Sequence, residues 1–140
     1  MDLDTSTDFG AMAERRLREE GVIWLTTVDP AGAPQPTPVW FHWDGETILI
    51  FSQPKVAKVR NIRANSKVAL SFNSDEYGGK VVVFTGQARF ADAPPGEARL
   101  AEYLTKYAEG IQSLKMTPEQ MLAEYSTAIL VTPEKVRGWE

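Results

Sequence analysis

Short, mostly apolar segments that end at turn-forming residues recur along this chain and limit the folds open to it. Branched and aromatic side chains fill these segments, which is typical of β-strands. The turn Asp44-Gly45 is a strong signal for a tight hairpin, so we expect neighbouring strands to pair in antiparallel fashion. The six predicted strands are Val22 to Val28, Gln35 to Trp43, Glu46 to Gln53, Lys67 to Asn73, Lys80 to Ala91 and Thr127 to Thr132.

The small number of helical segments between these strands decides the fold class. A doubly wound α/β sheet would need a helix between successive strands, and the sequence lacks that regular alternation. A chain of 140 residues falls in the usual range for one domain. We therefore predict a mainly β fold, a six-stranded antiparallel barrel that is closed or half-closed, with a few peripheral helices. Gly86 is expected to mark a bulge or a barrel corner.

The predicted organisation is a single domain. Pro94-Pro95-Gly96 interrupts the strand pattern, and apolar residues then recur at helical spacing. The expected parts are an N-terminal helix (residues 1–21), the barrel core with a candidate ligand-binding segment (22–91), a helical insertion (95–125) and the final strand and tail (126–140).

Residues 47 to 74 carry a concentration of positive charge in a chain whose net charge is -4. Their five cations, with no acid among them, are Lys55, Lys58, Arg60, Arg63 and Lys67. Ser52, Gln53 and Pro54 are expected to open a short helix here, with Pro54 at the first helical position. The helix start offers unpaired N–H groups and a positive dipole end, so with the first three cations it would form a phosphate cradle. The alternative is a solvated basic helix whose late cations complement its own C-terminal dipole.

Composition excludes several classes of function. The acidic balance argues against general nucleic-acid binding, which needs a basic face. There is no cysteine, so thiol catalysis and disulfides are excluded. His42 is the only histidine, which rules out a multi-histidine metal site within one chain, and we predict no metal. No apolar stretch is long enough for a membrane span and the N-terminus does not resemble a signal peptide, so we expect a cytoplasmic protein.

Few side chains look like catalysts. No G-x-S-x-G motif is present, and His42, between Phe41 and Trp43, is expected to point outward beside the hairpin rather than to catalyse. The four tryptophans serve the core or wall a flat aromatic ligand. We therefore predict no catalytic side chain, and chemistry that a bound cofactor would carry.

Two prolines limit how the predicted strand Gln35 to Trp43 can pair. Pro36 and Pro38 cannot donate to a ladder, so this stretch is expected to run along an edge of the sheet. They would leave strand carbonyls and the intervening N–H groups free of the ladder. A flat heterocycle could pair with those groups.

The residues of these segments carry a resemblance to a known family. The pieces VIWLTTVDPAGAPQPTPVWF, ILIFSQPKVAKVRNIRANSKVAL and VVVFTGQARF cover most of residues 22 to 91, and TAILVTPEKVRGW also fits. The combination of A-K-x-R-N-[IL]-R at Ala57 to Arg63 with P-Q-x-x-x-V at Pro34 to Val39 is fairly specific. The chain resembles the flavin/deazaflavin oxidoreductases of the split β-barrel superfamily, which also contains the pyridoxamine 5'-phosphate oxidases. Within it, the match is to the short deazaflavin group that uses coenzyme F-420.

The resemblance implies a homodimer of six-stranded split barrels with two cofactor sites at the subunit interface. It places the cofactor phosphate on Lys58 and Arg60, and the flat ring along residues 35 to 40. Lys80 would come from the partner subunit. The implied cofactor-binding residues are Gln35, Thr37, Pro38, Val39, Trp40, Ser52, Lys55, Lys58, Arg60 and Lys80. The resemblance does not say whether Arg63, Arg137 and Trp139 also line the site.

The resemblance also implies an activity, in which reduced F-420 passes a hydride to a small conjugated or aromatic acceptor. FMN is the alternative cofactor, because it shares the tricyclic ring and a nearby phosphate. The anionic tail of F-420 favours the deazaflavin, since a groove with Lys55, Lys58, Arg63 and Lys80 would attract it. The tail VRGWE lacks the Arg/His pattern expected for pyridoxamine phosphate as substrate. A non-catalytic protein that binds a flavin or a tetrapyrrole is the second class of function.

Overall fold

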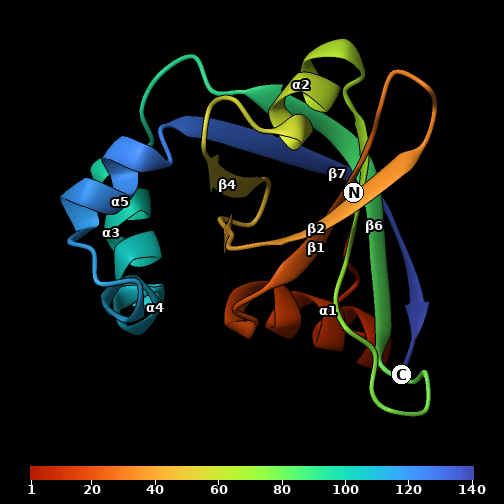
Figure 1. The fold of residues 1–140 in the computed structure, drawn as a ribbon. Helices are drawn as coiled ribbons and strands as arrows, with labels where there is room; N and C mark the ends of the chain where they lie inside the picture. The colour runs from red at the N-terminus through yellow and green to blue at the C-terminus, as the bar shows by residue number, and fades with distance from the viewer.

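The computed structural model describes all 140 residues and shows one curled antiparallel sheet with five helices (Figure 1). The sheet order is β2-β1-β5-β6-β7-β4-β3, a half-barrel that confirms the predicted mainly β split-barrel fold. The strands are β1 (Ile23–Val28), β2 (Pro34–Val39), β3 (His42–Trp43), β4 (Ile48–Ser52), β5 (Lys67–Ser71), β6 (Val81–Phe90) and β7 (Thr127–Trp139).

The sheet has seven strands rather than six because the segment predicted as Gln35 to Trp43 divides into β2 and β3. The break falls at Trp40 and Phe41. The backbone of Phe41 bonds to side chains outside the sheet: its N–H donates to the Tyr107 hydroxyl at 2.8 Å and its carbonyl accepts from Lys106 at 2.9 Å. Those bonds take the place of ladder bonds at this point.

The long pair β6–β7 carries the predicted irregularity at Gly86. Thr85 lies opposite Lys135, whereas Gly86 lies opposite Pro133, so one residue of β7 is extra. A Cβ atom at Gly86 would lie 2.2 Å from the carbonyl oxygen of Thr132, so only glycine fits there. The bulge confirms that prediction, and beyond it β7 continues past its expected end at Thr132 to Trp139.

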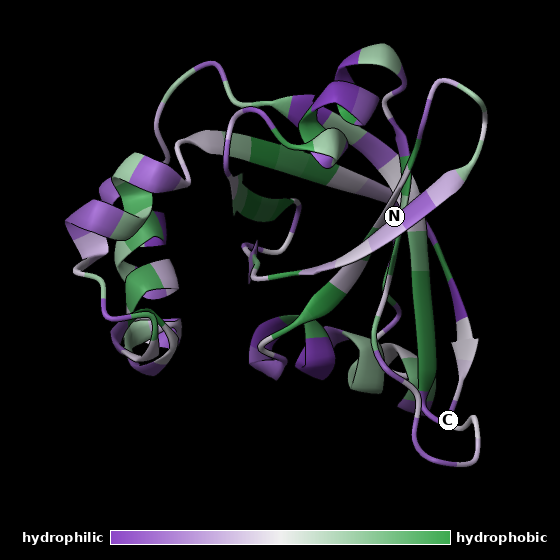
Figure 2. Ribbon diagram, in the orientation of Figure 1, coloured by the Kyte–Doolittle hydropathy of each residue, from purple (hydrophilic) through white to green (hydrophobic).

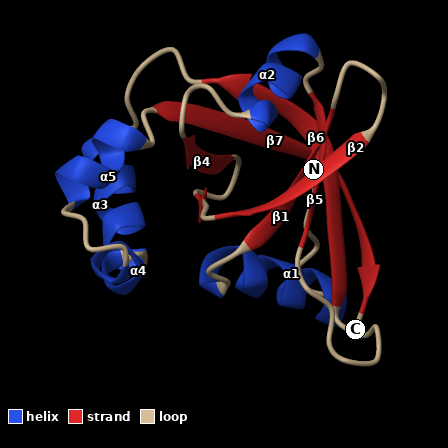
Figure 3. Cartoon of the chain, viewed as in Figure 1, coloured by secondary structure: helices blue, strands red, loops and turns tan.

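The helices lie outside the sheet (Figure 3). They are α1 (Asp8–Glu19), α2 (Ala57–Ala64), α3 (Glu97–Lys106), α4 (Ala108–Ser113) and α5 (Pro118–Glu124). The last three form a group on one side of the molecule, beyond β4 (Figure 1), and are called the helical layer below. None of the five is both long and apolar enough to cross a membrane.

Helix α2 begins later than predicted. Its N-cap is Val56, and Pro54 and Lys55 lie in a turn before it, so the prediction of Pro54 at the first helical position is wrong. The guanidinium of Arg60 donates to the Lys55 carbonyl at 2.8 Å. This side-chain bond satisfies a carbonyl that a helix starting at Pro54 would have used internally.

Two hydrophobic clusters hold these layers together. The larger, of 20 buried residues, fills the half-barrel between the sheet, α1 and α2, and hydrophobic residues accordingly gather along the central strands (Figure 2). The smaller is Tyr103, Tyr107, Ile111 and Met121 in the helical layer, with Trp40 and Phe51 of the sheet side packed against it. The second cluster is what joins the helical layer to the barrel.

Candidate functional site

A cavity of about 370 Å³ lies between the end of β2, the start of α2 and the helical layer. Eight of its ten lining residues are hydrophobic. They are Val22, Pro38, Val39, Trp40, Phe51, Lys58, Tyr103, Leu114, Met121 and Tyr125, and we call this space the apolar cavity. Its size suits a flat organic ligand. It brings together four residues of the predicted cofactor site: Pro38, Val39, Trp40 and Lys58.

Lys58 is the single cation in the wall of the apolar cavity. It forms no ion pair, and no residue of the chain hydrogen-bonds to its ammonium. Burial lowers the pKa of the Lys58 ammonium from its ordinary value. A half-buried charge without a partner is unfavourable, so an anion bound here would be stabilised.

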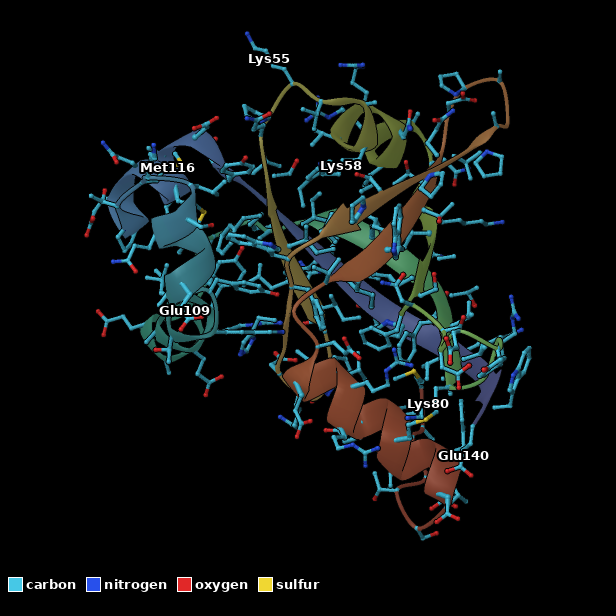
Figure 4. All side chains as sticks on the ribbon, turned by 60° about the horizontal axis from the view of Figure 1, so that its bottom comes forward. Lys55, Lys58, Lys80, Glu109, Met116 and Glu140 are labelled. Carbon is cyan, nitrogen blue, oxygen red and sulfur yellow. The ribbon has the colours of Figure 1, made fainter.

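The other predicted phosphate residues are placed differently. Lys55 is exposed and projects away from the chain, whereas Lys58 lies close to the body of the sheet (Figure 4). Arg60 is exposed, with one nitrogen bonded to the Lys55 carbonyl. Ser52 is buried, and its hydroxyl donates to the Gln53 carbonyl at 2.9 Å. Of the four, only Lys58 lines the cavity.

The start of α2 adds backbone donors beside Lys58. The N–H groups of Val59 and Arg60 donate to the Val56 carbonyl at 3.2 and 3.3 Å. The N–H groups of Ala57 and Lys58 come before the first helical bond and have no backbone acceptor. The helix start that was predicted to face an anion lies at Ala57, three residues after the predicted Pro54.

The free edge of β2 carries acceptors but no donors. Its prolines lie opposite alternate residues of β1, at Pro34, Pro36 and Pro38. Since proline has no N–H, the ladder bonds to β1 must come from the residues between them, Gln35 and Thr37. The outward face of the strand is left with the proline carbonyls. The edge position agrees with the prediction, but the expectation of free intervening N–H groups is wrong.

The two residues between the prolines differ from Pro38 in their surroundings. Gln35 is exposed, and its amide donates to the Asp29 carboxylate at 3.1 Å, on the side of the turn. Thr37 is partly buried. Neither lines the apolar cavity, which begins at Pro38.

Trp40 forms a rigid wall of the cavity. Its indole stacks on Tyr107, with ring centroids 4.6 Å apart and planes 4° apart. A Cβ atom at Gly110 would come within 2.9 Å of the same indole, so α4 also packs closely against it. The helical layer therefore fixes the wall before any ligand arrives.

The helical layer contributes to the cavity in a way that the sequence did not predict. It supplies Tyr103, Leu114, Met121 and Tyr125 to the cavity. The available signal was the pair of tyrosines at positions 103 and 107, four residues apart and so on one side of α3 and its C-terminal end. Burial raises the pKa of Tyr107 to about 12.

His42 is buried, so the prediction that it points outward is wrong. Its Nδ1 accepts from the Arg99 guanidinium at 3.0 Å, which leaves the proton on Nε2. Nε2 then donates to the Glu102 carboxylate at 2.6 Å. Both ring nitrogens are engaged with α3, and neither faces the apolar cavity.

Lys80 lies far from Lys58 in the same chain, near the other end of the molecule (Figure 4). It borders a different hollow of about 600 Å³, which is mainly polar and includes Arg15, Arg16 and Asp75. That hollow is larger, but it mixes acids with cations and has little apolar wall for a flat ring. Within one chain Lys80 does not reach the apolar cavity, and its delivery by a second subunit stays a prediction.

A half-barrel with an apolar cavity beside a helical layer defines a split-barrel protein. Residues 10–140 match the family model of pyridoxamine 5'-phosphate oxidase, and the chain belongs to this family. No curated protein matches the sequence.

Solved structures share this fold along most of their length. An F420 reductase is 27% identical, with a TM-score of 0.68 over 89% of this chain and 94% of that one. A putative pyridoxamine 5'-phosphate oxidase from Listeria innocua is 22% identical, with a TM-score of 0.63 over 91% of each chain. HutZ, a haem storage protein from Vibrio cholerae, is 19% identical, with a TM-score of 0.69 over 99% of this chain and 95% of that one. The last two show the fold alone.

Proposed function

We propose that this chain is an oxidoreductase that uses the reduced deazaflavin F-420 to transfer a hydride to a small conjugated or aromatic acceptor. The observation that carries the proposal is Lys58, an unpaired and half-buried cation in the wall of an otherwise apolar cavity. The similarity to an F420 reductase supports the choice of cofactor.

The residues present fit such a cofactor. Lys58 and the two free N–H groups at the start of α2 would hold its phosphate. The segment from Pro38 to Trp40 would lie along the ring, and the outward carbonyls of β2 would accept from a ring N–H. When bound, the reduced deazaflavin supplies a hydride, and the chain orients the reactants and excludes water from the apolar cavity.

FMN remains the alternative cofactor, because it presents the same kind of ring and a phosphate. The discriminating part is the tail of F-420, which is anionic. Lys55 and Arg63 are exposed beyond the cavity and would attract it. We therefore expect F-420 to bind more tightly than FMN, and the difference to shrink as salt is raised.

Titration of the purified chain with F-420, FMN and haem, followed by fluorescence and absorbance, tests the proposal. We expect Lys58→Ala to weaken F-420 binding about ten- to hundred-fold, the value of a charge-assisted contact of about 1.5–3 kcal/mol. Lys67→Ala is the matched control, because it removes an exposed cation of the same basic segment outside the cavity. Equal affinity of the wild type and Lys58→Ala would overturn the assignment of the phosphate site.

The haem arm of the titration tests the second class of function. The only histidine cannot coordinate iron without breaking its bonds to Arg99 and Glu102. We therefore expect haem to bind more weakly than F-420. Tight haem binding with no affinity for either flavin would instead support a non-catalytic tetrapyrrole carrier.

A further inference from the structure

Tyr103 is held firmly in the wall between α3 and the sheet. Its side chain is almost completely buried, at 2% exposed. The ring packs edge-on against Phe51, with centroids 4.8 Å apart, and at 4.9 Å against Tyr107. The position of its hydroxyl is therefore set by the packing of the ring.

The hydroxyl of Tyr103 has no hydrogen-bond partner in the chain. The contrast is Tyr107, whose hydroxyl lies within 3.0 Å of backbone groups of Gly21 and Phe41. Every fully buried side-chain oxygen or nitrogen of the protein has a partner. An oxygen without one must therefore keep some accessible surface, and Tyr103 is a residue of the wall of the apolar cavity.

The hydroxyl is a donor throughout the physiological range of pH. Burial raises the pKa of the Tyr103 phenol well above its ordinary value, and the nearby Tyr107 and Tyr125 raise it further. The phenol therefore stays protonated and neutral. An unpaired polar group in such surroundings is unfavourable for stability, and a ligand oxygen in the cavity would satisfy it.

We infer that the Tyr103 hydroxyl donates a hydrogen bond to a carbonyl oxygen of the acceptor molecule, and that the acceptor is a flat, uncharged conjugated carbonyl compound of the quinone type. Tyr125 carries the other hydroxyl of this wall, and Phe51, Leu114 and Met121 make the rest of it apolar. A carboxylate on the acceptor would need a cation, and the single cation of the cavity is taken by the cofactor phosphate. In this last step the inference rests on the proposed function.

The test compares two probes that differ in their oxygens. Menadione and 2-methylnaphthalene have the same fused-ring body, and only menadione carries carbonyl groups. Their affinities for the 140-residue chain are measured by ligand-observed NMR titration, with and without saturating F-420. We expect Tyr103→Phe to weaken menadione binding about five-fold, as for one neutral hydrogen bond, and to change 2-methylnaphthalene binding less than two-fold. Tyr77→Phe is the control, because Tyr77 is 89% exposed and does not line the cavity.

Thermal unfolding supplies a readout that does not depend on any ligand. Tyr103→Phe removes a hydroxyl that has no partner, so its Tm should equal or exceed that of the wild type. A lower Tm would show that the hydroxyl has a structural partner, and would overturn the inference.

The other outcomes are equally decisive. The inference fails if menadione does not bind, if Tyr103→Phe weakens both probes alike, or if the selective loss appears in Tyr125→Phe instead. Failure of the proposed function looks different. In that case F-420 does not bind to the wild type, while the selective effect of Tyr103→Phe on menadione persists in the cofactor-free chain and supports the donor site.

Discussion

The indole of Trp40 lies parallel to the phenol of Tyr107, with 4.6 Å between ring centroids and 4° between planes. The first residue follows β2 and the second lies between α3 and α4, so this stack joins the end of an edge strand to the helical layer. One side of the proposed ring site is thus built by two segments far apart in the sequence.

Tyr107 should matter for stability because its hydroxyl bonds to the backbone at the break between β2 and β3. Tyr107→Phe leaves the buried N–H of Phe41 without an acceptor, so we expect a loss of about 1–3 kcal/mol in the free energy of unfolding. Urea denaturation measures it. Tyr103→Phe is the natural comparison, since it removes a hydroxyl without a partner, and an equal loss in both variants would contradict this account.

Lys106 should make stability depend on pH in the alkaline range. Its ammonium lies 3.8 Å from the centre of the Phe41 ring, and burial lowers the pKa of Lys106 from 10.5 to about 8. Between these values the unfolded chain binds more protons than the folded one, so the free energy of unfolding should rise with pH. Well below pH 8 both states are protonated at this group and it adds no slope.

The urea midpoint at pH 8 and pH 10 measures this contribution. In Lys106→Met the rise should be smaller than in the wild type, because the titrating group is gone. A fall in wild-type stability over the same interval, or an unchanged rise in the variant, would show that another group governs this range.

His42 should be important for folding and dispensable for hydride transfer. His42→Ala leaves Arg99 and Glu102 without their shared partner, and we expect a loss of about 1–3 kcal/mol in the free energy of unfolding. The single-turnover rate of hydride transfer should stay within about tenfold of the wild type, the lower limit of a proton-transfer role. A hundred-fold slower rate in a folded variant that still binds F-420 would make His42 the acid of the reaction.

The chain should form a homodimer, with Lys80 completing the site of the other subunit. Light scattering is expected to give twice the 15.6 kDa of one chain at micromolar concentration. Lys80→Ala should weaken F-420 binding without dissociating the dimer. Lys67→Ala, which removes another exposed cation, should leave F-420 binding unchanged. A stable monomer that binds F-420 with full affinity would exclude the shared site.

The strands could be predicted because their signals are local. Alternating side chains and turn residues such as Asp44-Gly45 act over a few positions, and the bulge at Gly86 was visible as a glycine in a long strand. The position of Lys58 near the start of a helix could also be predicted, because the residues that signal a helix start lie close to it in the sequence. The family resemblance then added the ring segment Pro38 to Trp40.

The helical wall of the cavity could not be predicted in the same way. Contact between Phe41 and Tyr107 spans 66 residues, and nothing in either neighbourhood encodes it. The same contact explains the break after β2. The break was not predicted, because strand-forming residues continue through it in the sequence. The burial of His42 has a similar origin, because Arg99 and Glu102 reach it from α3 across nearly 60 positions.

The three prolines of β2 also bear on how these molecules meet one another. A strand added to an open sheet edge needs donors as well as acceptors, and the outward face of β2 offers only the carbonyls of Pro34, Pro36 and Pro38. Another chain therefore cannot extend the sheet at this edge, and the protein is protected there against edge-to-edge aggregation. A dimer therefore cannot form by strand pairing at this edge, so the proline carbonyls stay free to accept hydrogen bonds from a small molecule.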